Sequence, residues 1–160
     1  MARRNPLPAV WLVTDARIDA VLDRAIARLP RGSGVIFRHY QLSPDQRGVR
    51  LEQVRRLCRR FGHALEIAGE GYGPPAPRRR LATAHDLREI GRANRMGAGA
   101  ILLSPVHPTA THPGGKTLGP VRFLLLARRA RVPVIALGGM TARRFRSLRV
   151  HGWAAIDAFA

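Results

Sequence analysis

The sequence predicts an α/β protein in which helices alternate with parallel strands that form a β/α barrel. Three short apolar runs in the second half of the chain carry this prediction: residues 81–85, 100–109 and 134–140. Each run ends in small, hydroxyl or imidazole residues, and helical patterns separate the runs. In β/α barrels the chemistry takes place at the carboxyl ends of the strands, so these endings describe the rim of a barrel.

Apolar periodicity predicts three strands and two helices in the first half of the chain. The strands are expected over residues 9–14, 35–40 and 64–68. The helices are expected over residues 18–29 and 51–61, with a polar loop around Pro44 and Gly48 before the second helix. Cys58 lies on the apolar face of that second helix, so we interpret it as a small core residue rather than a nucleophile.

A break in the pattern separates the two halves. Residues 69–80 contain three glycines, three prolines and a run of three arginines, 78–80, so this segment is not a regular element and the arginines are expected to be solvated. Alternation then resumes, with strands expected over 81–83, 100–104, 132–137 and 153–157 and helices over 85–96, 120–131 and 141–150. About seven strands in strict alternation imply a parallel sheet with right-handed crossovers. No linker divides the chain, so residues 1–160 are interpreted as a single domain.

A doubly wound open sheet is the alternative architecture. Such a sheet usually carries a glycine-rich turn after its first strand, whereas residues 14–17 read Thr-Asp-Ala-Arg. The pair Gly138-Gly139, followed by Thr141 as a helix N-cap, suits the phosphate site that barrels form after their last two strands. Glycines let the backbone approach a ligand, and the N–H groups of a helix start attract phosphate.

Composition limits the classes of function. The 160 residues include 28 Lys and Arg against 10 Asp and Glu, a net charge of +18. Lys116 is the only lysine, and the arginines are spread over nearly every expected helix, so nucleic acid is expected as a nonspecific, salt-sensitive partner rather than the main ligand. No apolar run has the length of a membrane span, and the basic N-terminus does not resemble a signal peptide. With a single cysteine, the expected location is the cytoplasm.

Four motifs resemble the thiamine phosphate synthase and TenI-like family of TIM barrels. They are Trp-Leu-Val-Thr-Asp at residues 11–15, Thr-Ala-His at 83–85, the Ser-Pro-Val-His-Pro-Thr loop that begins at residue 104, and Pro-Val-Ile-Ala-Leu-Gly-Gly-Met at 133–140. The likeness is good over residues 81–159 and thin over residues 9–68. The resemblance implies a TIM-type β/α barrel.

The chain departs from the family pattern in the half of the site that would hold a magnesium-bound diphosphate. Of the family's Gln-x-Arg-x-Lys pattern only Arg38 is kept, with Ile36 and Tyr40 at the other two positions. Ala68 and Gly69 replace the family's Asn-Asp. The resemblance implies that the βα unit with a second acidic ligand is compressed into residues 69–80. We therefore expect a shortened barrel with one unit missing, whose open strand edges could pair with a second chain.

The phosphate half of the site is kept. The resemblance implies that Gly138 and Gly139 cradle the phosphate of a thiazole, with the backbone at Ile156 and Asp157 completing the cradle. A carboxylate at Asp157 would repel phosphate unless it points away or pairs with an arginine. The other residues expected to bind substrate or phosphate are Arg38, Thr83, Ser104, Thr109, Thr111 and His112.

Three functions are consistent with this pattern. TenI-like relatives tautomerise a thiazole phosphate carboxylate with a histidine at the position of His85, and imidazole suits that proton transfer near pH 7 without a metal or other cofactor. The second is thiamine phosphate synthesis, which would need Mg²⁺, with Asp15 as one candidate ligand. The third is a non-catalytic relic that binds phosphate or nucleic acid.

The other histidines are not expected to form a metal site. His107 and His112 lack a third metal ligand. His39 is expected at the rim and His63 on the surface.

Overall fold

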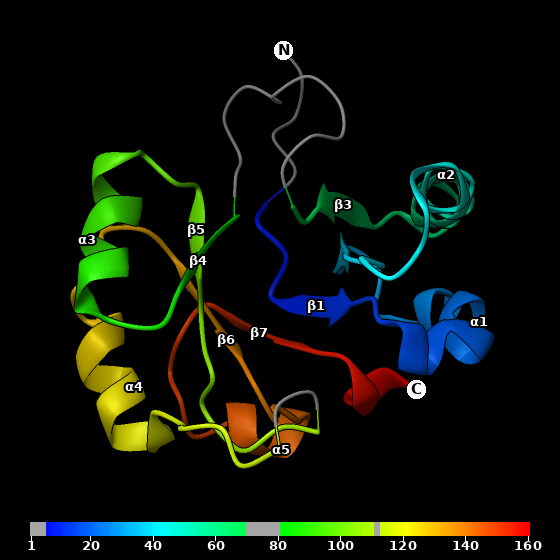
Figure 1. Cartoon of the computed structure of the whole chain (residues 1–160). Helices are drawn as coiled ribbons and strands as arrows, with labels where there is room; N and C mark the ends of the chain where they lie inside the picture. The colour runs from blue at the N-terminus through cyan, green and yellow to red at the C-terminus, as the bar shows by residue number, and fades with distance from the viewer. Residues whose placement is uncertain (1–5, 70–80, 111–112) are drawn as a thin grey trace.

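Seven parallel strands form one curled sheet. The computed structural model describes residues 6–69, 81–110 and 113–160. The strands are β1 (Val10–Val13), β2 (Gly34–Phe37), β3 (Ala64–Ile67), β4 (Leu81–Ala84), β5 (Ala100–Leu103), β6 (Val134–Leu137) and β7 (Gly152–Ala155). Their order in the sheet is β3-β2-β1-β7-β6-β5-β4, and every neighbouring pair is parallel (Figure 1).

The order of the strands is that of a barrel opened at one seam. Strand β1 pairs with both β2 and β7, which joins the first and last strands of the chain as in a closed barrel. In the described residues, β3 and β4 are the two ends of the sheet. The seam lies where the composition breaks, at residues 69–80. The predicted shortened TIM-type barrel of seven strands is therefore confirmed, and the doubly wound alternative does not apply.

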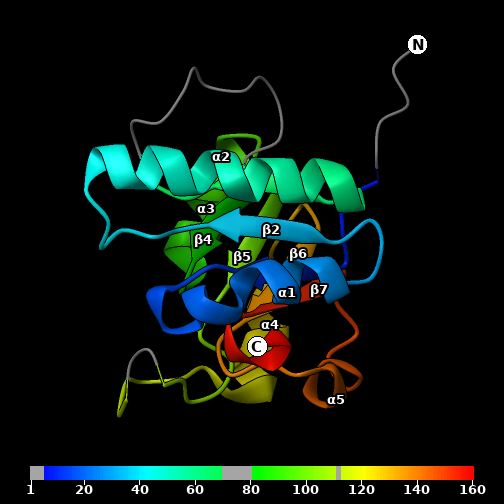
Figure 2. The same cartoon turned by 90° about the vertical axis from the view of Figure 1, so that its right-hand side faces the viewer.

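Helices cover the outside of the curled sheet on both flanks. They are α1 (Leu22–Arg28), α2 (Pro44–Phe61), α3 (Leu87–Arg95), α4 (Gly119–Ala127) and the short α5 (Ala142–Phe145), with 3₁₀ turns η1 (Ala16–Val21) and η2 (Asp157–Phe159). Helices α1 and α2 lie beside β1–β3, and α3 and α4 lie on the opposite flank (Figures 1 and 2). Because all strands run in one direction, their carboxyl ends meet at one rim of the sheet.

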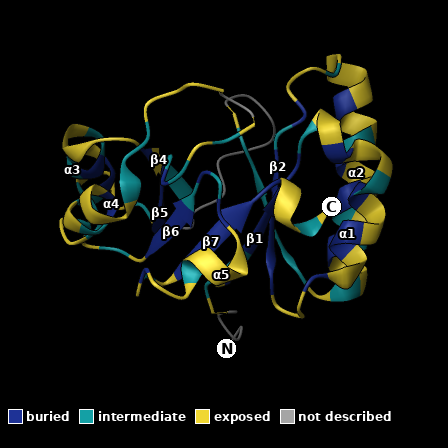
Figure 3. Ribbon diagram, turned by 90° about the horizontal axis from the view of Figure 1, so that it is seen from below, coloured by how far each residue is buried: buried dark blue, intermediate teal, exposed yellow. Residues whose placement is uncertain are grey.

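The buried side chains form two apolar clusters, and successive residues of β5, β6 and β7 alternate between them. On β5, Ala100 and Leu102 belong to the cluster that includes the interior of the sheet, while Ile101 and Leu103 belong to the cluster beneath α3 and α4. Both faces of the central strands are buried, as the continuous apolar runs predict (Figure 3). The exposed residues lie mainly on the outer faces of the helices.

Several predicted helix boundaries are wrong: α4 ends at Ala127 instead of residue 131, the helix expected from residue 18 begins as the 3₁₀ turn η1, and α2 and α5 differ as follows. Helix α2 begins at Pro44, within the segment expected to be a loop, because Ser43 and Gln46 form a reciprocal capping box and proline is favoured in the first turn. Helix α5 ends at Phe145 instead of continuing to residue 150. The hydroxyl of Ser147 donates to the carbonyl of Arg144 at 2.9 Å, which satisfies a backbone group at the end of this short helix.

None of the helices in the described ranges is both long and apolar enough to cross a membrane.

Candidate functional site

A cavity of about 840 Å³ lies at the carboxyl ends of the strands. The site residues predicted from sequence that the structure describes all line it: Arg38, Thr83, His85, Ser104, Thr109, Gly138, Gly139, Ile156 and Asp157. Thr111 and His112 lie outside the described residues. Side chains from Val13, Ile36 and Leu102 add apolar lining. The volume is within the range of roughly 300–1,000 Å³ that is usual for small-molecule sites.

The turn after β6 accepts only glycine at two successive positions. Gly138 and Gly139 have φ angles of +100° and +58°. A Cβ on Gly138 would lie 2.7 Å from Cα of Pro105, and one on Gly139 would lie 2.5 Å from the carbonyl oxygen of Pro108. The backbone N–H of His107 donates to the carbonyl of Gly138 at 3.0 Å, so the loop after β5 packs directly against this turn. The turn therefore presents backbone, with no side chain, to the cavity.

Cationic groups predominate around this turn. Arg144 and Lys116 line the cavity, and Arg144 also donates a hydrogen bond to the carbonyl of Gly139. Burial, reinforced by the charge of Arg144, lowers the pKa of His107, so this imidazole is neutral at pH 7. In the described lining, Asp157 is the sole carboxylate. The chemistry of this end of the cavity therefore suits an anion.

Asp157 pairs with an arginine from the other end of the chain. Nη1 of Arg17 lies 3.5 Å from its carboxylate, while Nε of the same guanidinium lies 3.1 Å from Asp15. Burial raises the pKa of Asp15, but hydrogen bonds from the backbone and side chain of Arg17 outweigh this effect and leave that pKa below its usual value. Arg17 thus partly neutralises the carboxylate that would otherwise oppose a phosphate beside Ile156.

His85 follows β4 and precedes α3. Asp86 caps the helix by accepting the backbone N–H of Glu89 at 2.8 Å. This cap brings Glu89 back toward the strand, where its carboxylate accepts the backbone N–H of His85 at 2.7 Å and lies 2.9 Å from Nδ1 of the ring. The side chain of His85 is 58% exposed and lines the cavity. Its ring is therefore both oriented and accessible.

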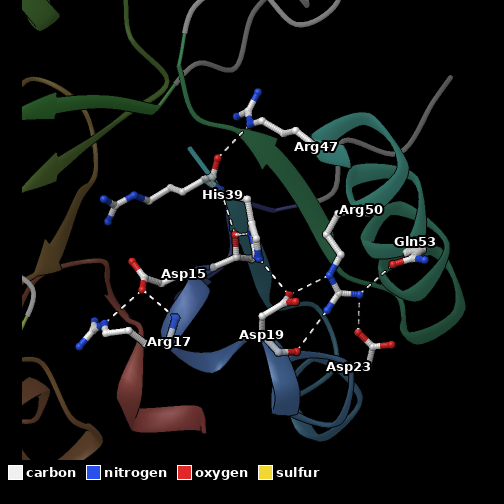
Figure 4. Close-up of polar contacts among 10 residues, drawn as sticks. Asp15, Arg17, Asp19, Asp23, His39, Arg47, Arg50 and Gln53 are labelled. Carbon is white, nitrogen blue, oxygen red and sulfur yellow. Dashed lines mark hydrogen bonds and ion pairs between the residues drawn. The ribbon is translucent and has the colours of Figure 1, made fainter. Parts of the chain in front are cut away.

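The backbone of Arg38 is fixed from both sides at the end of β2. Its N–H donates to Oγ1 of Thr14 at 2.9 Å, and its carbonyl accepts from Nε of Arg47 at 3.0 Å (Figure 4). Arg47 is buried in the first turns of α2 and also donates to the carbonyl of Ala68 at 2.8 Å. One guanidinium thus joins the carboxyl ends of β2 and β3, and Arg38 emerges from this anchored backbone into the cavity.

The prediction that His39 lies at the rim is wrong. Its side chain is fully buried, with Nδ1 2.8 Å from Oγ1 of Thr14 and Nε2 2.9 Å from a carboxylate oxygen of Asp19 (Figure 4). Arg50 of α2 binds the same carboxylate at 2.9 Å. Burial raises the pKa of Asp19, but the hydrogen bonds from His39 and Arg50 outweigh it and lower the pKa below its usual value. His63, expected on the surface, is half-buried.

The described residues do not fit a magnesium site at this rim. Ala68 and Gly69, at the end of β3, have no side-chain oxygen. Asp15 already accepts the backbone N–H and the guanidinium of Arg17. Within residues 6–69, 81–110 and 113–160, no three His, Cys, Asp or Glu side chains come together as metal ligands would. Hard cations such as Mg²⁺ need several oxygen ligands, and these residues do not supply them together.

Comparison with known proteins agrees with this architecture. Residues 81–159 match the family model TMP-TENI, described as thiamine monophosphate synthase. A curated protein of Aquifex aeolicus (strain VF5), named "Putative thiamine-phosphate synthase 2", is 26% identical over 128 residues, which cover 71% of this chain and 69% of that protein.

The chain therefore resembles the thiamine phosphate synthase and TenI-like family, over residues 81–159 in sequence and over most of its length in fold. A solved structure, thiamine phosphate pyrophosphorylase from Pyrococcus furiosus, superposes with a TM-score of 0.73 and 20% identity, covering 96% of this chain and 87% of that one. At this identity the likeness supports the fold alone. Together these relatives confirm the resemblance from which the TIM-type fold was predicted.

Several residues that shape the cavity were not predicted from sequence. Arg144 and Lys116 bring charge to the lining, Glu89 orients His85, and Arg17 pairs with Asp157. Glu89 had a local signal, because an acidic residue three positions after the N-cap Asp86 is typical of a helix start. The pair of Arg17 and Asp157 joins residues 140 positions apart, and no local pattern indicates it.

Proposed function

We propose that this protein binds a thiazole phosphate in the cavity and tautomerises its ring with His85 as the acid and base. The family that this chain resembles acts on small molecules such as thiazole phosphate. The proposal assigns one particular reaction of that family to this protein. The observation that carries the proposal is that one cavity contains both an oriented, exposed imidazole and the glycine-only turn at Gly138 and Gly139. The cavity's cationic lining supports binding of the phosphate.

The proposed phosphate position is the turn after β6. Backbone at Gly138 and Gly139 can approach an anion closely because neither residue has a side chain, and Arg144 and Lys116 add positive charge. Helix α5 has only four residues, and its N-cap Thr141 already accepts the N–H of Arg144 at 3.2 Å. We therefore assign phosphate binding to the glycine turn and its cations rather than to the helix dipole.

The proposed reaction is a proton transfer with no change in oxidation state. His85 removes a proton from the saturated ring carbon of the non-aromatic thiazole carboxylate, and a proton is delivered to the exocyclic carbon that is double-bonded to the ring, which leaves the ring aromatic. One C–H bond breaks, one C–H bond forms and the double bonds shift, so the atoms balance without a leaving group. An imidazole held by Glu89 can take and return this proton in the neutral pH range. Tautomerisation of this kind needs no metal.

The test is a tautomerisation assay on the purified protein. The non-aromatic thiazole phosphate carboxylate is added, and formation of the aromatic tautomer is followed by its ultraviolet absorbance. We expect turnover by the wild type and a loss of at least about 100-fold in His85→Asn, which is the lower range for removing a general acid and base. His151→Asn is the matched control, since His151 bonds the carbonyl of Leu7 and does not line the cavity. Wild-type-like turnover by His85→Asn would rule out the proposal.

Thiamine phosphate synthesis is the second candidate, because the Aquifex relative is named for that activity. It is tested by mixing the protein with Mg²⁺, hydroxymethylpyrimidine diphosphate and thiazole phosphate, then separating thiamine phosphate by chromatography. Product formation would favour the synthase and would imply ligands other than Ala68 and Gly69. A folded protein that forms no product but tautomerises the thiazole supports our proposal.

A non-catalytic role is the third candidate, favoured by the net charge of +18. Binding to duplex DNA at physiological salt, in a protein that turns over neither substrate, would support it. Binding that disappears between low and physiological salt is the behaviour expected of a nonspecific polyanion contact.

A further inference from the structure

An aromatic ring and two guanidinium groups lie together at the end of β2. The guanidinium carbon of Arg38 is 5.5 Å from the ring centroid of Tyr40, and that of Arg47 is 5.7 Å from the same centroid. Tyr40 nevertheless remains 58% exposed and lines the cavity, as does Arg38. Large aromatic side chains are usually more buried than this, so an exposed tyrosine inside a cavity offers a ring surface to a ligand.

This group is held in place by contacts that are themselves buried. Arg47 is 4% exposed and donates to the carbonyls of Arg38 and Ala68. Between Arg38 and Tyr40, His39 is fixed by Thr14 and Asp19 (Figure 4). A surface whose backbone is fixed on both sides loses little freedom when a ligand binds, which favours affinity.

The wall around Tyr40 is apolar on one side and cationic on the other. Ile36 and Ala68 line the cavity beside it, and the ring lies so close to Gly69 that a Cβ there would be 3.1 Å from Cε1 of Tyr40. Arg47 donates to the backbone carbonyls of Arg38 and Ala68 and does not line the cavity, whereas the side chain of Arg38 does. One half-buried guanidinium that lines the cavity matches a single anionic group better than a diphosphate.

We propose that Arg38 and Tyr40 form a subsite for a planar heteroaromatic ring that carries one carboxylate. The ring stacks on Tyr40, and the carboxylate binds the guanidinium of Arg38. This inference rests on the proposed function, because it places the ring end of a thiazole phosphate carboxylate whose phosphate lies at Gly138 and Gly139. It adds a specificity: ligands that are flat and singly charged at this end are preferred over non-planar or diphosphorylated ones.

The experiment measures binding of two small probes by isothermal titration calorimetry. The first probe, 4-methylthiazole-5-carboxylate, is planar and monoanionic, and the second, cyclopentanecarboxylate, has the same charge without a flat ring. We expect Tyr40→Phe to bind the planar probe within about twofold of the wild type. Tyr40→Leu should bind it about 3- to 12-fold more weakly while leaving the second probe unchanged, since stacking on an aromatic ring accounts for this range.

A third variant tests the charge. Arg38→Gln should weaken binding of both probes by about tenfold, because each loses a charge-assisted hydrogen bond. Arg92→Gln is the control, because Arg92 is an exposed arginine of α3 outside the cavity lining. Thermal unfolding of each variant checks that the fold is retained. Unchanged binding of cyclopentanecarboxylate by Tyr40→Leu is an independent check that this variant keeps its fold.

Two results would overturn the subsite. One is a Tyr40→Leu protein that binds the planar probe as well as the wild type does. The other is inorganic pyrophosphate that displaces the planar probe and binds with a lower dissociation constant than the planar probe itself. Failure of the proposed function is seen separately: a protein that shows the Tyr40-dependent binding but does not tautomerise thiazole phosphate keeps the subsite and loses the activity.

Discussion

One carboxylate of Glu89 contacts both the backbone and the ring of His85. The same oxygen, Oε2, accepts the backbone N–H at 2.7 Å and lies 2.9 Å from Nδ1. Since a carboxylate only accepts hydrogen bonds, Nδ1 carries the proton, and in the neutral ring Nε2 is left as the proton acceptor. The contact therefore selects both the tautomer and the orientation of an imidazole that lines the cavity.

Glu89→Gln should slow tautomerisation by about tenfold, which corresponds to the loss of one charge-assisted hydrogen bond. The amide retains the size of the side chain but presents either an oxygen or an N–H to Nδ1, so the ring orientation is no longer fixed. The measurement is the rate at saturating thiazole phosphate carboxylate. Glu52→Gln on α2 is the control, because Glu52 pairs with Arg55 and Arg56 of the same helix and does not line the cavity. Equal rates in the two variants would contradict a role for Glu89.

Gly138→Ala should destabilise the fold and abolish phosphate binding. The new Cβ would lie 2.7 Å from two atoms of Pro105, at a φ of +100°. Overpacking and backbone strain each cost about 1–3 kcal/mol. Gly97→Ala separates these effects, because Gly97 also has a positive φ of +66° but no heavy atom within 4 Å of a Cβ. Urea unfolding should show a larger loss for Gly138→Ala. A loss no larger than that of Gly97→Ala would show that the loop after β5 moves freely.

Local sequence patterns predicted the β/α fold, and the resemblance to the family indicated which residues line the cavity. Buried parallel strands leave continuous apolar runs, and the composition of residues 69–80 indicated the seam between β3 and β4. Because strand ends in such a sheet meet at one rim, residues as distant as Arg38 and Ile156 could be placed in one site. Their roles in binding and catalysis remain predictions.

Contacts between distant residues account for what could not be predicted. The imidazole of His39 is buried where Thr14 and Asp19, which are 25 and 20 residues away in the sequence, bind its two nitrogens. A buried arginine such as Arg47 is rare, and it is accommodated only because two strand ends offer carbonyls to it. Neither arrangement has a local periodicity that a sequence alone would reveal.

Arg47→Met should destabilise the protein by about 2–4 kcal/mol, because two buried carbonyls would lose a charged donor that an apolar side chain cannot replace. Methionine fills much of the same volume, so the effect reports on the hydrogen bonds more than on packing. Arg59→Met on the exposed face of the same helix is the control. Urea unfolding measures both. A loss below about 0.5 kcal/mol, the range of neutral surface changes, would contradict the role of Arg47 in joining β2 and β3.

Cys58 should resist alkylation in the folded protein. It is buried on α2, and burial raises the pKa of its thiol to about 11, with the charge of Arg55 opposing this only in part. The thiolate is the reactive species, so little of it is present at neutral pH. Iodoacetamide labelling followed by mass spectrometry should be slow in buffer and fast in denaturant. Rapid labelling of the native protein would mean that α2 opens often.

Stability should decrease as the pH falls below 6.5, the usual pKa of histidine. Burial lowers the pKa of His63, and the hydrogen bond to the carbonyl of Ile26 opposes this without reversing it. The unfolded chain therefore takes up its proton first as the pH falls, which favours unfolding until the folded pKa is also passed. His63→Leu should flatten the dependence of the urea midpoint between about pH 7.5 and 5.5, on either side of the histidine pKa. His151→Leu serves as the comparison, since the side chain it removes is exposed. An unchanged slope in His63→Leu would show that another group causes the pH dependence. His107 would then be replaced next, because burial and the charge of Arg144 also lower its pKa.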